Sequence, residues 1–252
     1  MVLKLLRRAI EPAPPAARVP DGVRVYAIGD IHGRLDLLDD LLFRIDADDR
    51  AREAAQSQLI FLGDLIDRGP SSAGVVQRAL DLQRSGRSVR FLMGNHEEVF
   101  LKALAGNLEA LRFFVKIGGR STIISYGFDE DEYAGLDFED LLPALIERVP
   151  EDHVAFLSDF EDRIAVGDYL FVHAGIRPRV AIEDQSGGDL RWIRSEFLDF
   201  RGTHGPIVVH GHTICDEVEE RSNRIGIDTG AFASGRLTSL GLEGDDRWYL
   251  ST

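Results

Sequence analysis

The sequence predicts an α/β fold in which buried strands alternate with helices. Two observations carry this prediction. Short apolar runs, typical of strands buried on both faces, occur at Val23–Ile28, Leu59–Leu62, Val89–Met93, Tyr169–Val172 and Ile207–Val209. Stretches with the periodicity of amphipathic helices, Leu35–Ala47 and Ser72–Arg84, lie between the first three runs. This alternation predicts a βαβ core.

The middle of the chain has a different pattern. From Val99 to Asp162 it is helical and acidic, with amphipathic stretches at Leu141–Val149 and His153–Phe160, which predicts a helical cap inserted at about residues 100–160. Further strands are predicted at Arg163–Val166, Arg224–Asp228, Leu237–Leu242 and Arg247–Leu250, and Gly167-Asp168 predicts a hairpin turn after the first of these. The core is therefore either two packed sheets or one mixed sheet flanked by helices.

The 252 residues suffice for one large domain. Four prolines between residues 11 and 20 predict an extended segment, so we expect a mobile tail over residues 1–20 and a domain over residues 21–252. Charged residues interrupt the apolar stretch of Met1–Ile10, and stable membrane association is therefore not expected.

The charge composition indicates which kinds of molecule the chain is not expected to bind. The chain has 29 basic and 43 acidic residues and a net charge of −14, which disfavours binding to nucleic acid. Cys215 is the only cysteine, so no intramolecular disulfide is possible and a cytoplasmic location is expected. Nothing in the sequence predicts an oligomeric state.

Residues of metal-ligating type follow each of the five apolar runs. They are Asp30 and His32, Asp64, Asn95 and His96, His173, and His210 and His212. Open α/β sheets bind their ligands at the carboxyl ends of the strands. A single buried His or Asp is usually a hydrogen-bonded core group, but five successive strand ends favour a metal site.

Six of these residues form a consistent ligand set: Asp30, His32, Asp64, Asn95, His173 and His212. Oxygen and imidazole donors without a thiolate suit Mn²⁺, Fe or Zn²⁺. Six donors are too many for one tetrahedral ion and fit two ions that share a carboxylate. Two ions roughly 3.5–4 Å apart bind a bridging hydroxide for in-line attack on phosphorus, so phosphate ester hydrolysis is expected.

Three ordered blocks resemble the signature of the phosphoprotein phosphatase family within the calcineurin-like metallophosphoesterases. They are Gly29-Asp30-Ile31-His32-Gly33, Gly63-Asp64-Leu65-Ile66-Asp67-Arg68-Gly69 and Gly94-Asn95-His96-Glu97, followed by His173-Ala174-Gly175 and His210-Gly211-His212-Thr213. The resemblance covers nearly the whole chain after residue 20. It implies a β-sandwich of two mixed sheets flanked by helices, with a helical cap insert.

The resemblance also implies roles for individual residues. Asp30 and His32 would hold the first ion, Asp64 would bridge, and Asn95, His173 and His212 would hold the second ion, with Mn²⁺ the expected metal. Asn95 would also contact the substrate phosphate. His96 would be the general acid, and Asp67 would orient it, because a positioned imidazole can protonate a leaving alkoxide at neutral pH.

Arginines are the expected phosphate ligands, since a guanidinium binds phosphate oxygens bidentately. Arg68 is one candidate. Arg194 is the second, because Leu190-Arg191-Trp192-Ile193-Arg194 is similar to a Trp-x-Arg segment of phage and bacterial members of the family. Arg191 competes with it, and Arg120 is explained equally well as a solvated loop residue.

The remaining candidates have simpler interpretations. Asp228 is expected to brace a loop beneath the site. His210 is expected to line the site without being needed as a ligand, and His153 to pack a helix. Cys215 is expected to be inert. No role is assigned to His204.

The expected function is a serine/threonine-type protein phosphatase acting on a phosphorylated protein or a small phosphoester. The main alternative is hydrolysis of dinucleoside polyphosphates such as diadenosine tetraphosphate. The acidic insert disfavours that alternative unless Arg112, Lys116 and Arg120 turn inward. A nuclease is less favoured, because Thr213-Ile214 replaces the x-His of a Gly-His-x-His ending. The intact His96, Asp67 and Arg68 argue against a noncatalytic metal-bound scaffold.

Overall fold

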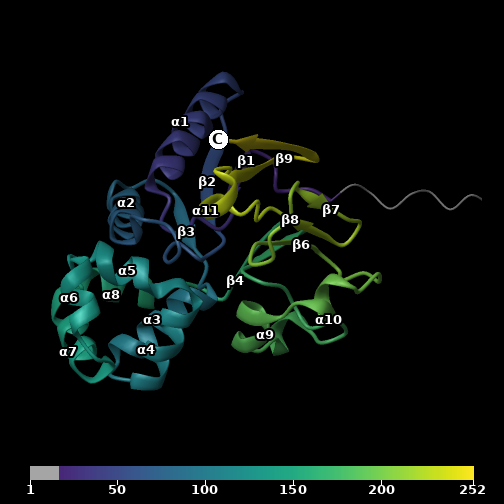
Figure 1. Ribbon diagram of the computed structural model, residues 1–252. Helices are drawn as coiled ribbons and strands as arrows, with labels where there is room; N and C mark the ends of the chain where they lie inside the picture. The colour runs from purple at the N-terminus through teal and green to yellow at the C-terminus, as the bar shows by residue number, and fades with distance from the viewer. Residues whose placement is uncertain (1–16) are drawn as a thin grey trace, which may run out of the picture.

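Two five-stranded sheets stacked on one another form the centre of the computed structural model, which describes residues 17–252 (Figure 1). The first sheet has the order β10-β9-β1-β2-β3. Its strands are β1 (Val23–Ile28), β2 (Gln56–Phe61), β3 (Val89–Phe91), β9 (Thr238–Glu243) and β10 (Asp246–Ser251). The second sheet has the order β4-β5-β6-β8-β7. Its strands are β4 (Arg163–Val166), β5 (Tyr169–Val172), β6 (Ile207–His210), β7 (Glu219–Glu220) and β8 (Arg224–Gly226).

Both sheets are mixed. In the first, β1, β2 and β3 run parallel, whereas β9 is antiparallel to both β1 and β10. In the second, β5, β6 and β8 run parallel, and β4 and β7 pair antiparallel at the two edges. Each sheet therefore gathers the carboxyl ends of three parallel strands at one edge.

Side-chain alternation explains why the sheets stack. Val25 and Ala27 of β1 face the core between the sheets, which also contains Phe171 of β5 and Val209 of β6. Tyr26 lies between them in sequence and packs into the separate core under the helices. Because both faces of the central strands are buried, their sequences are almost continuously apolar.

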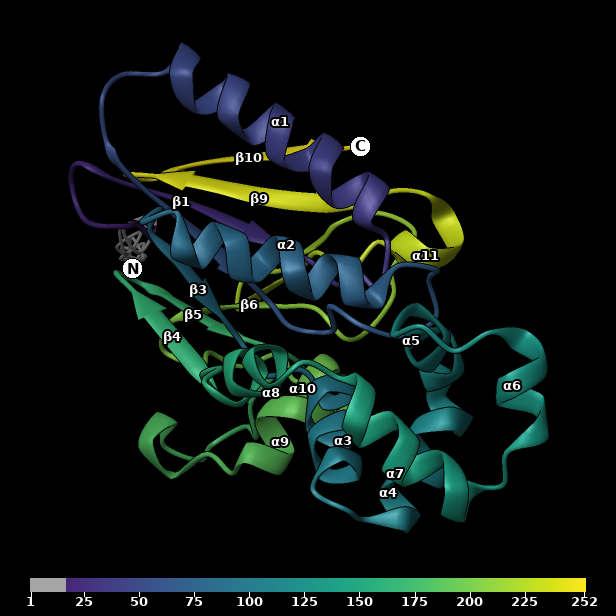
Figure 2. The ribbon, with the colours of Figure 1, turned by 90° about the vertical axis from the view of Figure 1, so that its left-hand side faces the viewer.

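Helices cover the outer faces. The helices α1 (Leu35–Ala51) and α2 (Ser72–Arg84) lie across the first sheet, as Figure 2 shows, and α9 (Gly187–Trp192) and α10 (Ser195–Leu198) cover the second. Short turns of helix occur at Ile182–Asp184 and in α11 (Ala231–Ser234). The predicted α/β class is confirmed, in the form of two mixed sheets flanked by helices.

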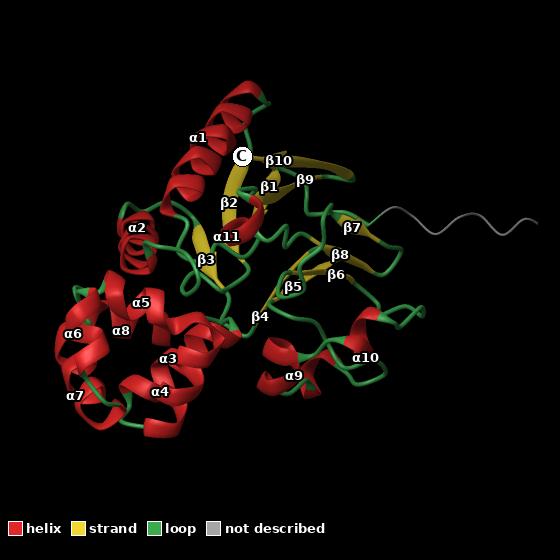
Figure 3. Cartoon of the chain, viewed as in Figure 1, coloured by secondary structure: helices red, strands yellow, loops and turns green. Residues whose placement is uncertain are grey.

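A wholly helical segment separates β3 from β4 (Figure 3). It consists of α3 (Asn95–Leu104), α4 (Leu108–Phe114), a π-helical turn (Val115–Gly119), α5 (Arg120–Ser125), α6 (Glu130–Gly135), α7 (Phe138–Arg148) and α8 (Glu151–Ser158). This helical insert begins at the carboxyl end of β3. It therefore stands beside the edge where the strand ends meet.

The expected tail over residues 1–20 lies largely outside the described residues, but its last four residues do not behave as a tail. Val19 is fully buried between the sheets, and its N–H donates to the carbonyl of Gly244 at 2.9 Å. The boundary at residue 20 is thus too late, because an apolar side chain in the core fixes the chain before it. Among residues 17–252, no helix is both long and apolar enough to cross a membrane.

Candidate active site

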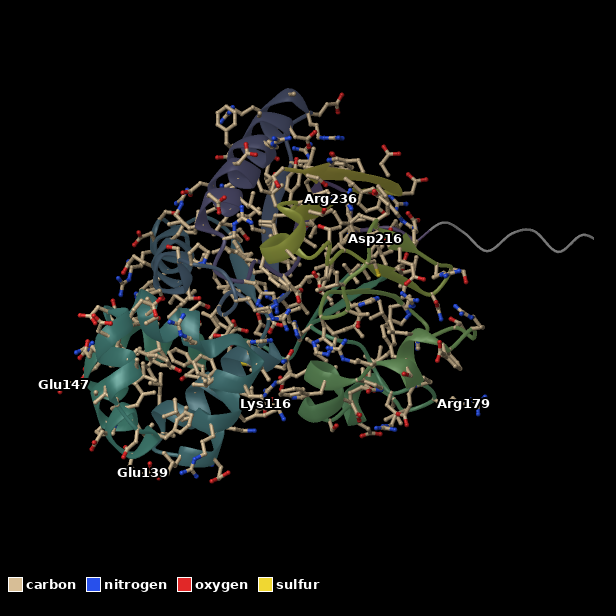
Figure 4. All side chains as sticks on the ribbon, viewed as in Figure 1. Lys116, Glu139, Glu147, Arg179, Asp216 and Arg236 are labelled. Atoms are coloured by element: carbon tan, nitrogen blue, oxygen red, sulfur yellow. The ribbon has the colours of Figure 1, made fainter. Side chains whose placement is uncertain are left out.

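The six expected metal ligands come together where the carboxyl ends of the two sheets meet. Asp30 and His32 follow β1, Asp64 follows β2, Asn95 begins α3, His173 follows β5 and His212 follows β6. All six side chains are buried. Figure 4 shows side-chain nitrogen and oxygen atoms concentrated in this region, between the insert and the sheets.

The first expected group is Asp30, His32 and Asp64; the donor atoms of His32 and Asp64 lie within 4.8 Å of one another and of His96, whereas Asp30 accepts the N–H of His212 at 3.0 Å. His32 Nε2 lies 3.6 Å from Asp64 Oδ2. The other ring nitrogen, Nδ1, lies 2.7 Å from the carbonyl of Ile66, which can only accept, so Nδ1 carries the proton and Nε2 presents a lone pair. Asp30 Oδ1 is buried without a hydrogen-bond partner among the described residues. An orphaned buried carboxylate oxygen and a free imidazole lone pair are both groups that a bound cation would satisfy.

The second group contains Asn95, His173 and His212. His173 Nε2 lies 3.0 Å from Asn95 Oδ1, 3.2 Å from His212 Nδ1 and 3.4 Å from Asp64 Oδ1. His173 Nδ1 donates to the carbonyl of Leu62 at 2.7 Å, so its Nε2 is also a lone-pair donor. Asp64 thus turns one oxygen toward each group, an arrangement suited to a shared ligand.

Burial favours the neutral form of these histidines, which is the form that binds a metal ion. Burial lowers the pKa of His32 to about 3 and that of His212 to about 2, and it also lowers the pKa of His173. All three imidazoles are therefore neutral at pH 7, which is the state that binds a metal.

His96 lies beside the first group but is held differently. Its Nδ1 is 2.5 Å from Asp67 Oδ2, and its Nε2 is 3.1 Å from a guanidinium nitrogen of Arg68 and 3.8 Å from Asp64 Oδ2. Burial lowers the pKa of His96, but the carboxylates of Asp64 and Asp67 outweigh it, so the net shift is upward. A raised pKa favours a protonated imidazole, the state a general acid requires.

Backbone strain is concentrated at these residues. Positive φ angles occur at His32 (46°), Asp64 (49°), Asp67 (75°), Arg68 (67°) and His212 (62°), and elsewhere among non-glycine residues of the described chain only at Arg179. Such angles cost of order 1–3 kcal/mol each and persist only where surrounding contacts impose them. The fold therefore tolerates local backbone strain at the residues whose side chains form the site.

Glu97 imposes part of this conformation, and sequence reasoning missed that role. Its buried carboxylate accepts the backbone N–H of Asp64 at 2.9 Å, of Leu65 at 2.8 Å and of Gly94 at 3.1 Å. It thereby ties the loop carrying Asp64 to the start of α3. A Cβ on Gly94 would lie 2.3 Å from Asp64 Oδ1, so the approach requires glycine. The only signal in the sequence is a glutamate at the third position of the helix, which is typical of a capping interaction.

The candidate phosphate-binding arginines differ in whether a carboxylate already pairs with them. Arg194 is exposed and makes no ion pair with the described residues. Burial lowers the pKa of His173 and His212, and the charge of Arg194 adds to that shift, which places Arg194 near the second group. Arg191 is instead bound to Asp162 at 2.6 Å, and Arg120 is paired with Glu130. Arg68 has no carboxylate partner among residues 17–252.

Two aromatic side chains, also missed in the sequence, lie at the rim. The ring of Phe232 is 5.5 Å from that of His32, and the guanidinium of Arg68 lies 4.9 Å from its centroid. The ring of Trp192 is 6.5 Å from that of His212. Both are half-buried.

Comparison with known proteins identifies the family. The model of the calcineurin-like phosphoesterases matches residues 23–229, which include the six candidate ligands, Asp67, Arg68, His96 and Arg194. The chain belongs to the calcineurin-like phosphoesterase family. It is accordingly a metal-dependent phosphoesterase, as the strand-end pattern predicted.

Relatives of this phosphoesterase bear on its substrate. It is 27% identical to an asymmetrical bis(5′-nucleosyl)-tetraphosphatase of Anoxybacillus flavithermus, over 84% of this chain and 88% of the relative. It is 32% identical to a symmetrical bis(5′-nucleosyl)-tetraphosphatase of Janthinobacterium, over 61% of this chain but only 44% of the relative's length. A candidate diadenosine tetraphosphatase has the same fold, with a TM-score of 0.62 at 22% identity over 94% of this chain and 98% of that one. All three of these proteins are named for tetraphosphatase activity, and none of the three for serine/threonine protein phosphatase activity.

The other residues singled out in the phosphoesterase serve its structure. His153 contacts the hydroxyl of Tyr126 and the side chain of Gln77, both at 3.0 Å. His210 Nε2 lies 3.3 Å from Arg224, away from the ligand cluster. Asp228 accepts the N–H of Gly230 at 2.9 Å in a loop next to Asp30. Cys215 is half-buried, and burial raises the pKa of its thiol, which disfavours the reactive thiolate.

Proposed function

We propose that this phosphoesterase hydrolyses dinucleoside tetraphosphates such as diadenosine tetraphosphate at a dinuclear metal centre. The observation that carries the proposal is the combination of a complete site with a tetraphosphatase relative aligned over most of both chains. Fold alone does not set the substrate, because one fold hosts many activities. The relatives therefore supply the substrate class, and the site supplies the chemistry.

Within this proposal the ligands divide as their geometry suggests. Asp30 and His32 would hold one ion, Asn95, His173 and His212 would hold the other, and Asp64 would be shared by both. We propose Mn²⁺ as the metal, with Fe or Zn²⁺ compatible with the same donors. When bound, the ions supply positive charge to the phosphoryl oxygens and lower the pKa of the attacking water.

The protein's own groups then orient the substrate. Arg68 and Arg194 bind phosphate oxygens, since neither is neutralised by a carboxylate among the described residues. Asn95 contacts the same phosphate through its amide. In the structure an Arg68 N–H donates to the unprotonated His96 Nε2 at 3.1 Å. Phosphate binding would draw Arg68 away, so that Nε2 can take up a proton from water and then donate it to the leaving group.

Two of the three basic residues considered for a cluster on the insert are paired with carboxylates, and the third, Lys116, is exposed. Arg112 is paired with Glu139 at 2.8 Å, and Arg120 is paired with Glu130. Glu139 and Glu147 lie on the outer edge of the insert (Figure 4). Charge compensation therefore rests on Arg68, Arg194 and divalent ions, which commonly accompany substrate phosphates. Phe232 and Trp192 offer aromatic surfaces of the kind on which nucleobases stack.

The proposal is tested by identifying products from diadenosine tetraphosphate. Cleavage of the central anhydride gives two ADP, and cleavage of an outer anhydride gives AMP and ATP. We expect one of these patterns from the Mn²⁺-loaded enzyme, resolved by ion-exchange chromatography. Absence of nucleotide products from a preparation that hydrolyses p-nitrophenyl phosphate would overturn the proposal.

Arg194→Ala tests the phosphate-binding role. Loss of a bidentate charged contact worth about 1.5–3 kcal/mol should lower kcat/KM by roughly 10- to 100-fold. The melting temperature should not change, because Arg194 has no ion-pair partner to lose within the described chain. Arg191→Ala is the matched control: it removes ion pairs with Asp162 at 2.6 Å and Glu98 at 3.6 Å, outside the proposed phosphate contacts, and should leave kcat/KM nearly unchanged. A larger kinetic loss in Arg191→Ala than in Arg194→Ala would reverse the assignment.

A further inference from the structure

The helical insert is bonded directly to the loop that carries Asp67 and Arg68. We call residues 118–125 of the insert the docking segment. The N–H of Arg68 donates to the carbonyl of Gly118 at 3.1 Å, and the N–H of Ala73 donates to the hydroxyl of Ser125 at 3.0 Å. The insert is therefore attached at both ends of this loop.

Thr122 lies between these two attachments and contacts Asp67 twice. The Thr122 hydroxyl donates to Asp67 Oδ1 at 2.6 Å, and the backbone N–H of Asp67 donates back to Thr122 Oγ1 at 2.9 Å. Ser72 Oγ lies 2.8 Å from Thr122 Oγ1 and accepts the same N–H at 2.9 Å. Thr122, Ser72 and Asp67 are all fully buried. An ionised carboxylate only accepts, so Thr122 must be the donor to it.

The two oxygens of Asp67 consequently have different partners. Thr122 holds Oδ1 and His96 Nδ1 holds Oδ2 at 2.5 Å. Rotation about the last bond of an aspartate is soft, so one contact alone does not fix the plane of the carboxylate. The second contact, from Thr122, fixes that plane and with it the direction in which Asp67 holds the imidazole.

We propose that Thr122 is a positioning residue for the Asp67–His96 pair, so that the helical insert forms part of the catalytic apparatus. This inference rests on the proposed role of His96 as general acid. It also accounts for a glycine in the docking segment. Gly118 has a φ of +122°, and a Cβ there would lie 2.8 Å from Arg68 Cγ, so only glycine allows the segment to approach the loop.

The test compares Thr122→Val, which keeps the shape and removes the hydroxyl, with Thr122→Ser, which keeps the hydroxyl. The substrates are phenyl phosphate, whose leaving group needs a proton, and p-nitrophenyl phosphate, whose leaving group needs it less. We expect Thr122→Val to lower kcat on phenyl phosphate by roughly 10- to 100-fold, because small misplacements of catalytic groups cost about this much. The loss on p-nitrophenyl phosphate should be smaller, and Thr122→Ser should restore most of the rate.

Two further variants separate positioning from general loosening. Ser125→Ala removes the bond from Ala73 and the bond to the Thr122 carbonyl but leaves the Thr122 hydroxyl and Asp67 in place, so it should lower the melting temperature without changing the ratio of the two rates. Thr122→Val added to His96→Asn should cause no further loss, because residues that act through one another are not additive. Metal content is measured in every variant.

The outcomes distinguish this inference from the function on which it rests. If His96→Asn shows no dependence on the leaving group, the general-acid role itself fails. If His96→Asn behaves as expected, the positioning role is overturned by either of two results. One is a Thr122→Val loss that is equal on both substrates, and the other is a loss that adds fully to that of His96→Asn.

Discussion

Asp64→Asn is expected to lose bound metal and at least about 10³-fold of kcat together, since a shared ligand serves both ions. Asp64 Oδ2 lies 3.6 Å from His32 Nε2, and Oδ1 lies 3.4 Å from His173 Nε2, so each oxygen belongs to a different donor group. An amide has only one oxygen, and its NH₂ group presents hydrogens where the second ion requires a lone pair. The substitution also removes a negative charge from a buried cluster.

Metal analysis of the purified variant, together with its kcat on p-nitrophenyl phosphate, checks this prediction. Asp162→Asn is the control, because Asp162 binds Arg191 at 2.6 Å outside the ligand cluster. It should retain both metal and rate. Two ions per chain and a normal kcat in Asp64→Asn would show that the ligands have been assigned wrongly.

His96→Asn is expected to retain its metal and to lose roughly 10²–10⁴-fold of kcat on substrates with poor leaving groups. Its Nδ1 is bound to Asp67, and its Nε2 points toward the donor cluster without belonging to the ligand set we propose. The loss should be smaller on p-nitrophenyl phosphate. The loss should also be smaller on diadenosine tetraphosphate, because the departing nucleotide phosphate is a weaker base than an alkoxide and depends less on protonation.

Rates on phenyl phosphate, p-nitrophenyl phosphate and diadenosine tetraphosphate, measured on one metal-loaded preparation, give the comparison. Thr122→Ser provides a control that keeps every group around the acid. A uniform loss on all three substrates, or a loss of metal from His96→Asn, would mean that His96 positions an ion or the phosphate and is not an acid. The donor atoms of His96, His32 and Asp64 do lie within 4.8 Å of one another, which makes this measurement decisive.

The bounds of helices and strands were predictable where burial determines which residues are apolar. The strand Val23–Ile28 and the helix Ser72–Arg84 have the bounds that their apolar patterns predict. β2 begins three residues earlier than its apolar run, at Gln56, because its polar first residues pair with Val23 and Arg24 of β1. Backbone pairing thus extends a strand beyond the part whose side chains are buried.

The convergence of the six candidate ligands was predictable because it follows a simple rule of strand ends, whereas the contacts that support them were not. Glu97 acts on backbone groups more than 30 positions away, and Thr122 acts on Asp67 across 55 positions. Neither contact leaves a local pattern in the sequence. Arg191 and Arg120 differ from Arg194 in having ion-pair partners. These pairs form only in the folded chain, so the sequence did not predict them.

The proposed substrate follows neither from the strand ends nor from the His96–Asp67 pair, because one arrangement of residues serves esters and anhydrides alike. The most direct measurement is kcat/KM for diadenosine tetraphosphate and for a phosphoserine peptide on the same Mn²⁺-loaded enzyme. The account predicts a preference of at least about tenfold for the dinucleotide, equivalent to about 1.4 kcal/mol of transition-state binding. A preference for the phosphopeptide would contradict it.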